Sequence, residues 1–191
     1  MPNLPRVLLL GDSIRMSYQP LVAAMLEGRA EVVGPAENCQ YSEFTLSRLP
    51  VWFELFGRPD IVHWNNGLHD VGCNNQRQPE QFPLATYIAN LRAILEHLRA
   101  IEAAVIWATS TPVHPTEPVP GEQWSWTNED INRYNAAARE SMEAEGVPIN
   151  DLHALVSADV ERYLAEDRLH LSAAGQRACA EAVVEAVGMM G

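Results

Sequence analysis

The sequence predicts an α/β fold in which a mostly parallel sheet of about five strands carries helices on both faces. Short apolar runs alternate with longer amphipathic segments along the 191 residues, a pattern typical of strand–helix–strand units. The first apolar run, residues 7–10, is continuous and is closed by Gly11, as expected for a buried central strand. Crossovers between parallel strands are expected to be right-handed.

The remaining elements follow from apolar periodicity and from helix-ending residues. Four more strands are expected at residues 31–34, 60–64, 104–108 and 147–149. Helices are expected at residues 18–27 before Gly28, at 45–56 with an interruption near Pro50, and at 84–100, where leucines and isoleucine recur every three or four positions. Gly57 and Pro59 stop the second of these helices.

Two polar residues are expected to cap the later helices. Thr127 precedes one helix, with Asp130 three residues on in place of the usual glutamate, and Ser172 precedes an alanine-rich helix over 173–187. Residues 152–164 indicate a short helix or turn. Residues 110–125 form a long proline-rich loop, which in a compact domain is usually functional or mobile. Nothing divides the chain, so residues 1–191 are expected to form one domain.

The composition of the chain limits the classes of molecule that it is expected to bind. The net charge of −12 repels nucleic acid and anionic membranes, whereas a neutral or cationic small molecule suits it. No apolar stretch is long enough to span a bilayer, and three scattered cysteines give no disulfide framework. The N-terminus lacks the features of a secretory signal, which favours a cytoplasmic protein, although a trimmed chain has the same appearance.

Reactive residue types gather where the predicted strands end. In parallel α/β sheets, ligands bind at the carboxyl ends of the strands. Ser13 follows the first strand, and the loop after the fifth strand carries Asp167 and His170. A serine hydroxyl becomes a nucleophile when a base takes its proton, and a carboxylate can orient an imidazole base. The backbone N–H of Ser13, at a helix start, is also directed toward a developing oxyanion.

Three segments resemble the GDSL, or SGNH, hydrolase family over nearly the whole chain. Gly11-Asp12-Ser13-Ile14 is similar to its first motif, and the segment from Asp167 to Gly175 is similar to its last. Gly67-Leu68-His69-Asp70 stands where the family has Gly-x-Asn-Asp. The resemblance implies a three-layer α/β/α, flavodoxin-like fold and ester hydrolysis by Ser13, His170 and Asp167, without a metal or cofactor.

Two departures from the family concern the oxyanion site. His69 stands in place of the family asparagine, and either His69 or Asn66 is a candidate side-chain donor. Glu43 aligns with the glycine whose backbone N–H serves the oxyanion in the family. The expected oxyanion residues are therefore Ser13, Glu43, His69 and Asn66. Losing one donor typically lowers the rate on the order of a hundred- to a thousandfold.

The substrate is expected to be a small ester with a short acyl group, such as an acetylated sugar or another polar alcohol. Candidate substrate-binding residues are Asp12, Trp124 and Trp126. The two tryptophans either stack on a sugar ring, cover an acyl pocket or fill a hydrophobic space under the long loop. Alternatives are a thioesterase or lysophospholipase for longer acyl chains, and a catalytically weak binding protein. A metal hydrolase using His69, Asp70, Asp167 and His170 is disfavoured because no close ligand pair lies on one helix.

Overall fold

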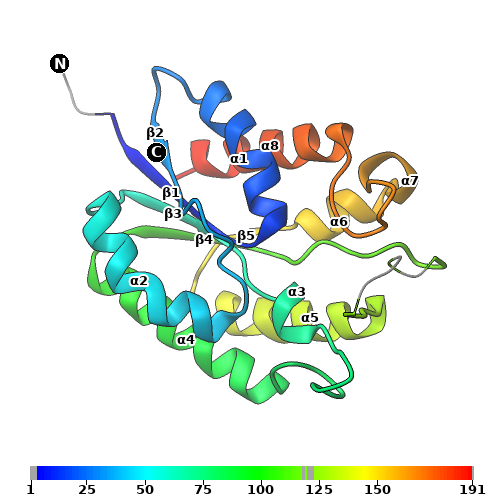
Figure 1. Cartoon of the computed structure of the whole chain (residues 1–191). Coiled ribbons are helices and arrows are strands. Elements are labelled where there is room, and N and C mark those ends of the chain that lie inside the picture. Colours follow the sequence, from blue (N-terminus) through cyan, green and yellow to red (C-terminus); the bar gives the residue numbers. More distant parts are fainter. Residues whose placement is uncertain (1–3, 118, 120–122, 191) are drawn as a thin grey trace.

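A computed structural model of the chain describes residues 4–117, 119 and 123–190. Residues 118 and 120–122 of the expected 110–125 loop, together with 1–3 and 191, lie outside the described residues. The described part contains a parallel five-stranded sheet in the order β2-β1-β3-β4-β5 (Figure 1). Its strands are β1 (Arg6–Leu10), β2 (Glu31–Val33), β3 (Ile61–Trp64), β4 (Ala104–Ala108) and β5 (Ile149–Asn150).

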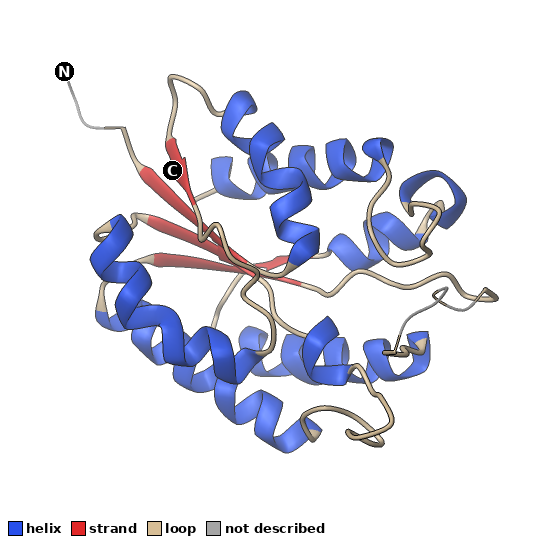
Figure 2. Cartoon of the chain, viewed as in Figure 1, coloured by secondary structure: helices blue, strands red, loops and turns tan. Residues whose placement is uncertain are grey.

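Helices cover both faces of the sheet, which confirms the three-layer α/β/α prediction (Figure 2). One face carries α1 (Ser13–Met25), α6 (Leu152–Ser157), α7 (Val160–Tyr163) and α8 (Ala173–Gly188). The other face carries α2 (Ser42–Phe56), α3 (Leu68–Val71), α4 (Leu84–Ala100) and α5 (Asn128–Ala144). None of the described helices is long and apolar enough to cross a bilayer.

The strand order places a topological switch point between β1 and β3. The chain runs from β1 outward to β2, then returns past β1 to β3 and continues to β4 and β5. Ligands of open parallel sheets bind where the order reverses, because the loops leaving the two central strands diverge there. Ser13 begins α1 just beyond β1, and α3 begins just beyond β3. Both therefore stand at this point.

The core lies between the sheet and the two helix layers. Val7, Leu8, Leu9 and Leu10 are fully buried, as expected for a central strand. The predicted apolar stripe of α5 is buried along its whole length, in Ile131, Tyr134, Ala138 and Met142. Burial of these faces removes apolar surface from water and holds the layers together.

Two helices differ from the expected boundaries. α1 begins at Ser13, five positions before the predicted start, because Asp12 caps it and Arg15 is buried against backbone carbonyls instead of facing solvent. α2 begins at Ser42 and continues through Pro50 without the predicted interruption. Proline removes one helix hydrogen bond, but Leu49 and Trp52, buried on either side, hold both halves against the core.

The other differences are small. β2 and β3 are each one residue shorter than expected, and β5 starts at Ile149 instead of 147. Residues 152–164 form two short helices, α6 and α7, and α3 lies in a segment expected to be loop. The two predicted caps are confirmed, because Thr127 accepts the N–H of Asp130 and Ser172 accepts that of Gly175.

Candidate active site

Ser13 is placed by the turn between β1 and α1. The buried Asp12 side chain accepts the N–H of Ile14 at 2.9 Å and so caps α1. Ser13 is the first residue of α1, so its N–H is one of the first-turn donors that have no acceptor within the helix. The carboxylate of Asp12 thus has a structural task, and Asp12, expected as a substrate-binding residue, also lines the cavity that contains Ser13.

Ser13, His170 and Asp167 form one chain of hydrogen bonds. The Ser13 Oγ lies 2.9 Å from Nε2 of His170, and Nδ1 of His170 lies 2.7 Å from Oδ2 of Asp167. The other carboxylate oxygen of Asp167 accepts the backbone N–H of His170 at 2.8 Å. Because an ionised carboxylate only accepts, Nδ1 carries the proton and Nε2 is left to accept from the serine hydroxyl.

The Asp167 carboxylate is stabilised in its ionised form. Partial burial alone raises its pKa, but the hydrogen bonds from His170 and from the backbone N–H of Leu169 outweigh this and lower the pKa below its usual value. The group is therefore an anion at neutral pH, which is the state that orients a neighbouring imidazole and stabilises its protonated form.

The loop that carries Asp167 and His170 is tied to the long 110–126 segment. Arg168 has a left-handed backbone, with φ of 68°, and its guanidinium pairs with Glu117 at 2.5 Å. Its carbonyl accepts the N–H of His114 at 3.0 Å, and the buried His114 ring bonds to Glu161 at 2.9 Å. Sequence reasoning assigned no partner to His114, because these contacts join segments far apart in the chain.

Asn66 is a structural tie. Its Nδ2 donates to the Gln40 carbonyl and to Thr45 Oγ1, both at 3.0 Å, and its Oδ1 accepts from Trp64 Nε1. Both amide hydrogens are thus used, and the side chain is buried. The structure leaves Asn66 no free N–H for an oxyanion, contrary to its expected role as a substitute donor.

The segment before α2 differs from the expected alignment. Glu43 lies exposed in the first turn of α2. It lines a cavity of about 640 Å³ and does not line the separate cavity that contains Ser13. The left-handed conformation that favours glycine falls instead at Gln40, with φ of 50°. The N–H of Gln40 donates to Oδ1 of Asn38 at 2.7 Å. Sequence reasoning did not single out Asn38 and Gln40, because a hydrogen bond within a loop leaves no periodicity or motif in the sequence.

The backbone of His69 is positioned by its neighbour Asp70, which is anchored to α2. The buried Asp70 carboxylate accepts the N–H of Ser42 at 3.0 Å and its hydroxyl at 2.5 Å, which joins α3 to the start of α2. Burial raises the pKa of Asp70 to about 7, although the Ser42 hydrogen bonds oppose the shift. His69, half-buried on α3, borders both cavities.

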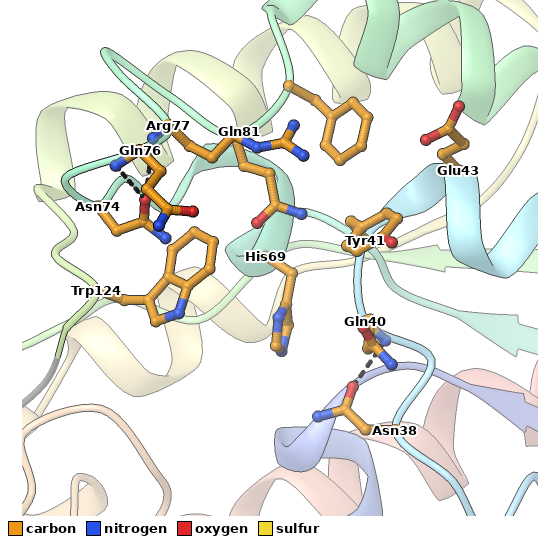
Figure 3. Close-up of a pocket in the computed structure, with 11 residues that line it drawn as sticks. Asn38, Gln40, Tyr41, Glu43, His69, Asn74, Gln76, Arg77, Gln81 and Trp124 are labelled. Atoms are coloured by element: carbon orange, nitrogen blue, oxygen red, sulfur yellow. Dashed lines mark hydrogen bonds between the residues drawn. The ribbon is translucent and has the colours of Figure 1, made fainter.

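Two neighbouring cavities meet at His69. The smaller, of about 180 Å³, contains Ser13 and His170 and is walled by Ile14, Leu68 and Leu169 among others. The larger, of about 640 Å³, is shown in Figure 3. It is lined by amide, aromatic and charged side chains, namely Asn38, Gln40, Tyr41, Glu43, His69, Asn74, Gln76, Arg77, Gln81, Phe82 and Trp124.

The two predicted substrate-binding tryptophans both reach the site. Trp126 lines the smaller cavity and donates from Nε1 to the carbonyl of Leu68 at 2.8 Å. A Cβ at Gly72 would lie 2.9 Å from that nitrogen, so glycine is needed for the close approach. Trp124 lines both cavities, and in Figure 3 it and Tyr41 flank His69 on opposite sides.

The four residues of the metal-hydrolase alternative are divided between two clusters. Asp70 is turned to Ser42, whereas Asp167 is turned to His170. Within the part of the chain that the structure describes, no three His, Cys, Asp or Glu side chains are grouped so as to hold a metal ion.

Comparisons with known proteins show the family to which the chain belongs. The model of the GDSL-like Lipase/Acylhydrolase family matches residues 9–178. The human protein named isoamyl acetate-hydrolyzing esterase 1 homolog is 28% identical over 190 residues, which cover 90% of this chain and 76% of that protein.

Solved structures share the fold. A lipase/acylhydrolase from Enterococcus faecalis superposes with a TM-score of 0.78 at 20% identity, over 98% of this chain and 97% of that one. The acetyl xylan esterase AlAXEase gives 0.75 at 21% identity, over 95% and 99%. These likenesses confirm the α/β/α fold. The family match includes both terminal motifs and ends within α8, the last helix. The chain belongs to the GDSL-like lipase/acylhydrolase family, a family of esterases and acylhydrolases.

Proposed function

We propose that this chain is a serine esterase that hydrolyses small carboxylic esters through an acyl-enzyme. The observation that carries the proposal is the hydrogen-bond chain from Ser13 through His170 to Asp167, with separations of 2.9 and 2.7 Å. A nucleophile, a base and an orienting carboxylate within hydrogen-bond reach are the requirements for acyl transfer by a serine hydroxyl.

The two half-reactions use the same base. Ser13 Oγ attacks the ester carbonyl while its proton passes to Nε2 of His170, and Asp167 stabilises the imidazolium that forms. His170 then returns the proton to the departing alkoxide, which leaves as the alcohol. In the second half, His170 takes a proton from water, the resulting hydroxide attacks the acyl carbonyl, and Ser13 regains its proton as the acid departs.

The start of α1 supplies the first oxyanion donor. The backbone N–H of Ser13 is not used by the helix, and the positive end of the α1 dipole lies beside it. A negative charge that develops on the carbonyl oxygen next to Ser13 is stabilised by both. His69, one of the two side-chain donors that the sequence suggested, borders the same cavity.

The shapes of the cavities support a short acyl group. The smaller cavity, about 180 Å³ beside Ser13, has apolar walls in Ile14, Leu68 and Leu169 and room for a group such as acetyl. The larger cavity, about 640 Å³, offers amides and aromatic rings to the alcohol part. Amides that donate and accept, next to flat rings, suit the hydroxyls and faces of a sugar.

The names of two relatives agree with this substrate class. The human relative is named as a homolog of an isoamyl acetate-hydrolyzing esterase, and the structural neighbour is named as an acetyl xylan esterase. Both names refer to acetate esters. The narrow cavity beside Ser13 argues against the alternative of a thioesterase or lysophospholipase for long acyl chains. The binding-protein alternative keeps the same cavities but has no turnover.

The test is ester hydrolysis by wild type and Ser13→Ala. With p-nitrophenyl acetate, butyrate and octanoate, we expect wild type to prefer acetate and Ser13→Ala to lose measurable turnover. Ser17→Ala is the matched control, because Ser17 lies one turn along α1 and its hydroxyl bonds, among the described residues, only to the Ile14 carbonyl. Equal slow rates for wild type and Ser13→Ala contradict the esterase and favour the binding protein, and octanoate preference favours the long-chain alternative.

A further inference from the structure

Asn38 lies at the boundary between the two cavities with one end of its amide fixed. Its Oδ1 accepts the N–H of Gln40 at 2.7 Å, so its Nδ2 faces the opposite way. Figure 3 shows this nitrogen directed away from Gln40, into the space below His69. Asn38 lines the cavity of Ser13 and His170 as well as the larger one. Among the described residues, no acceptor binds Nδ2 of Asn38.

The backbone around Asn38 is tied to the turn that holds Ser13. The N–H of Cys39 donates to the Gly11 carbonyl at 3.2 Å, two residues before Ser13. Arg15 bonds to that carbonyl from Nη2 at 3.2 Å and to the Glu37 carbonyl at 3.0 Å. The backbone on either side of Asn38 is therefore held relative to the Ser13 turn by Arg15 and by the Gly11 carbonyl.

His69 is a weaker candidate for the same task. Within residues 4–117, 119 and 123–190, no hydrogen bond holds its ring, so neither its orientation nor its tautomer is fixed by a partner. A neutral imidazole has one N–H, whereas the Asn38 amide offers two and does not titrate. Preorganised donors stabilise developing charge best, because they need no reorientation during the reaction.

We propose that Asn38 is a catalytic residue that donates from Nδ2 to the oxyanion, alongside the Ser13 N–H, in place of the family asparagine that His69 replaces. This inference rests on the proposed esterase function. As Ser13 Oγ bonds to the carbonyl carbon, the carbonyl π pair moves to oxygen and that oxygen accepts the Asn38 hydrogen bond. The Asn38 proton stays on nitrogen throughout.

The test is Asn38→Asp with p-nitrophenyl acetate. A carboxylate still accepts the Gln40 N–H but has no donor and adds negative charge, so we expect kcat to fall on the order of a hundred- to a thousandfold with little change in KM. Asn132→Asp is the matched control, since it makes the same amide-to-carboxylate change at an exposed position of α5 that lines neither cavity. We expect its kcat to stay near wild type, and we expect His69→Gln to lose less kcat than Asn38→Asp does.

A second measurement separates a catalytic donor from a structural residue. Trifluoroacetone forms a hemiketal with the active serine, and its oxygen takes the place of the oxyanion. We expect the Ki of this ketone to rise by the same factor by which kcat falls, at an unchanged melting temperature. Asn38→Ser, which removes the amide without adding charge, repeats the comparison if Asn38→Asp unfolds more easily.

The outcomes distinguish this inference from the proposed function. If Ser13→Ala is inactive while both Asn38 variants keep kcat and Ki near wild type, the esterase stands and the inference is overturned. A large loss in His69→Gln alone assigns the donor to His69. If wild type and Ser13→Ala cleave the ester at the same rate, the inference and the proposed function fall together.

Discussion

The Ser13 hydroxyl lies 2.9 Å from Nε2 of His170, although 157 positions separate the two residues in the chain. Ser13 is fixed at the start of α1, and His170 lies just before α8, which packs against α1 on one face of the sheet. The loop of His170 is closed by a bridge between Leu164 and Leu171. The packing of the first and last helices therefore brings the serine and the histidine together.

Asp167→Asn tests the orientation of His170. An asparagine amide can donate toward Nδ1 and thereby favour the wrong imidazole tautomer, so we expect kcat on p-nitrophenyl acetate to fall roughly a thousandfold or more. Glu166→Gln makes the same change at the exposed neighbour and is expected to leave kcat near wild type. Similar rates in the two variants would remove Asp167 from the mechanism.

The fold could be predicted from sequence where burial sets the pattern. The helix at Leu84–Ala100 and the strand at Ala104–Ala108 have the expected boundaries, because their apolar periodicity reflects contact with the core. The largest error in a helix start lies where a polar residue is buried. Arg15 is only 2% exposed in α1, because its guanidinium bonds to carbonyls of a distant loop. A buried arginine interrupts the apolar pattern, so the pattern did not reveal that the helix begins at Ser13.

The candidate site could be predicted only where local sequence sets the geometry. Asp167 and His170 lie three residues apart and meet through one short turn. The oxyanion region depends on long-range contacts instead. The amide N–H groups of Asn66 donate to Gln40 and Thr45. The orientation of the Asn38 amide depends on the backbone N–H of Gln40. No apolar periodicity or motif spacing encodes these bonds.

Leu169→Ala tests the assignment of the smaller cavity to the acyl group. Leu169 lines that cavity beside His170, and removing its branched end enlarges the space for the acyl chain. We expect the ratio of kcat/KM for butyrate over acetate to rise about tenfold, since a methylene is worth roughly 1–3 kcal/mol in such a pocket. The measurement is the p-nitrophenyl ester series used for wild type.

Leu164→Ala is the control for this change. Leu164 is similarly buried and lies in the same loop region, but it does not line the cavity. Both variants are expected to lose stability by about 2–5 kcal/mol, so rates are compared below their melting temperatures. An equal shift in chain-length preference in both variants would mean that loosening of the loop, not cavity volume, sets the preference.

Asp70→Asn tests the effect of the buried carboxyl on stability. Burial raises the pKa of Asp70 from 3.8 to about 7, so the folded state holds a proton that the unfolded state releases between these values. Its contribution to the free energy of unfolding is complete below pH 4 and is lost as pH rises toward 7. We expect Asp70→Asn to gain stability relative to wild type across this window, by on the order of 2 kcal/mol between pH 5 and 8.

Urea unfolding at several pH values measures this difference. Asparagine retains the acceptor for the Ser42 N–H, so the α2–α3 contact is kept. Asp60→Asn, at an exposed carboxylate that accepts the N–H of Arg6, is the control and is expected to show no such gain over the window. Curves for wild type and Asp70→Asn that run parallel from pH 5 to 8 would show that Asp70 is ionised in the folded state throughout.

Gly175→Ala tests the packing that frames the His170 loop. A Cβ at Gly175 would lie 2.2 Å from the carbonyl oxygen of Tyr163, which also accepts the N–H of Ser172. Because the clash is with backbone, α8 must shift from α7, and we expect a loss of about 1–3 kcal/mol in the free energy of unfolding. Gly188→Ala, in the last turn of the same helix, meets no atom of the described residues within 4 Å. It is expected to be neutral or stabilising by up to about 1 kcal/mol. Chemical denaturation of both variants decides the point: equal stabilities would mean that the α7–α8 contact yields freely, and the loop of Asp167 and His170 would then depend on Arg168 and its partners for its position.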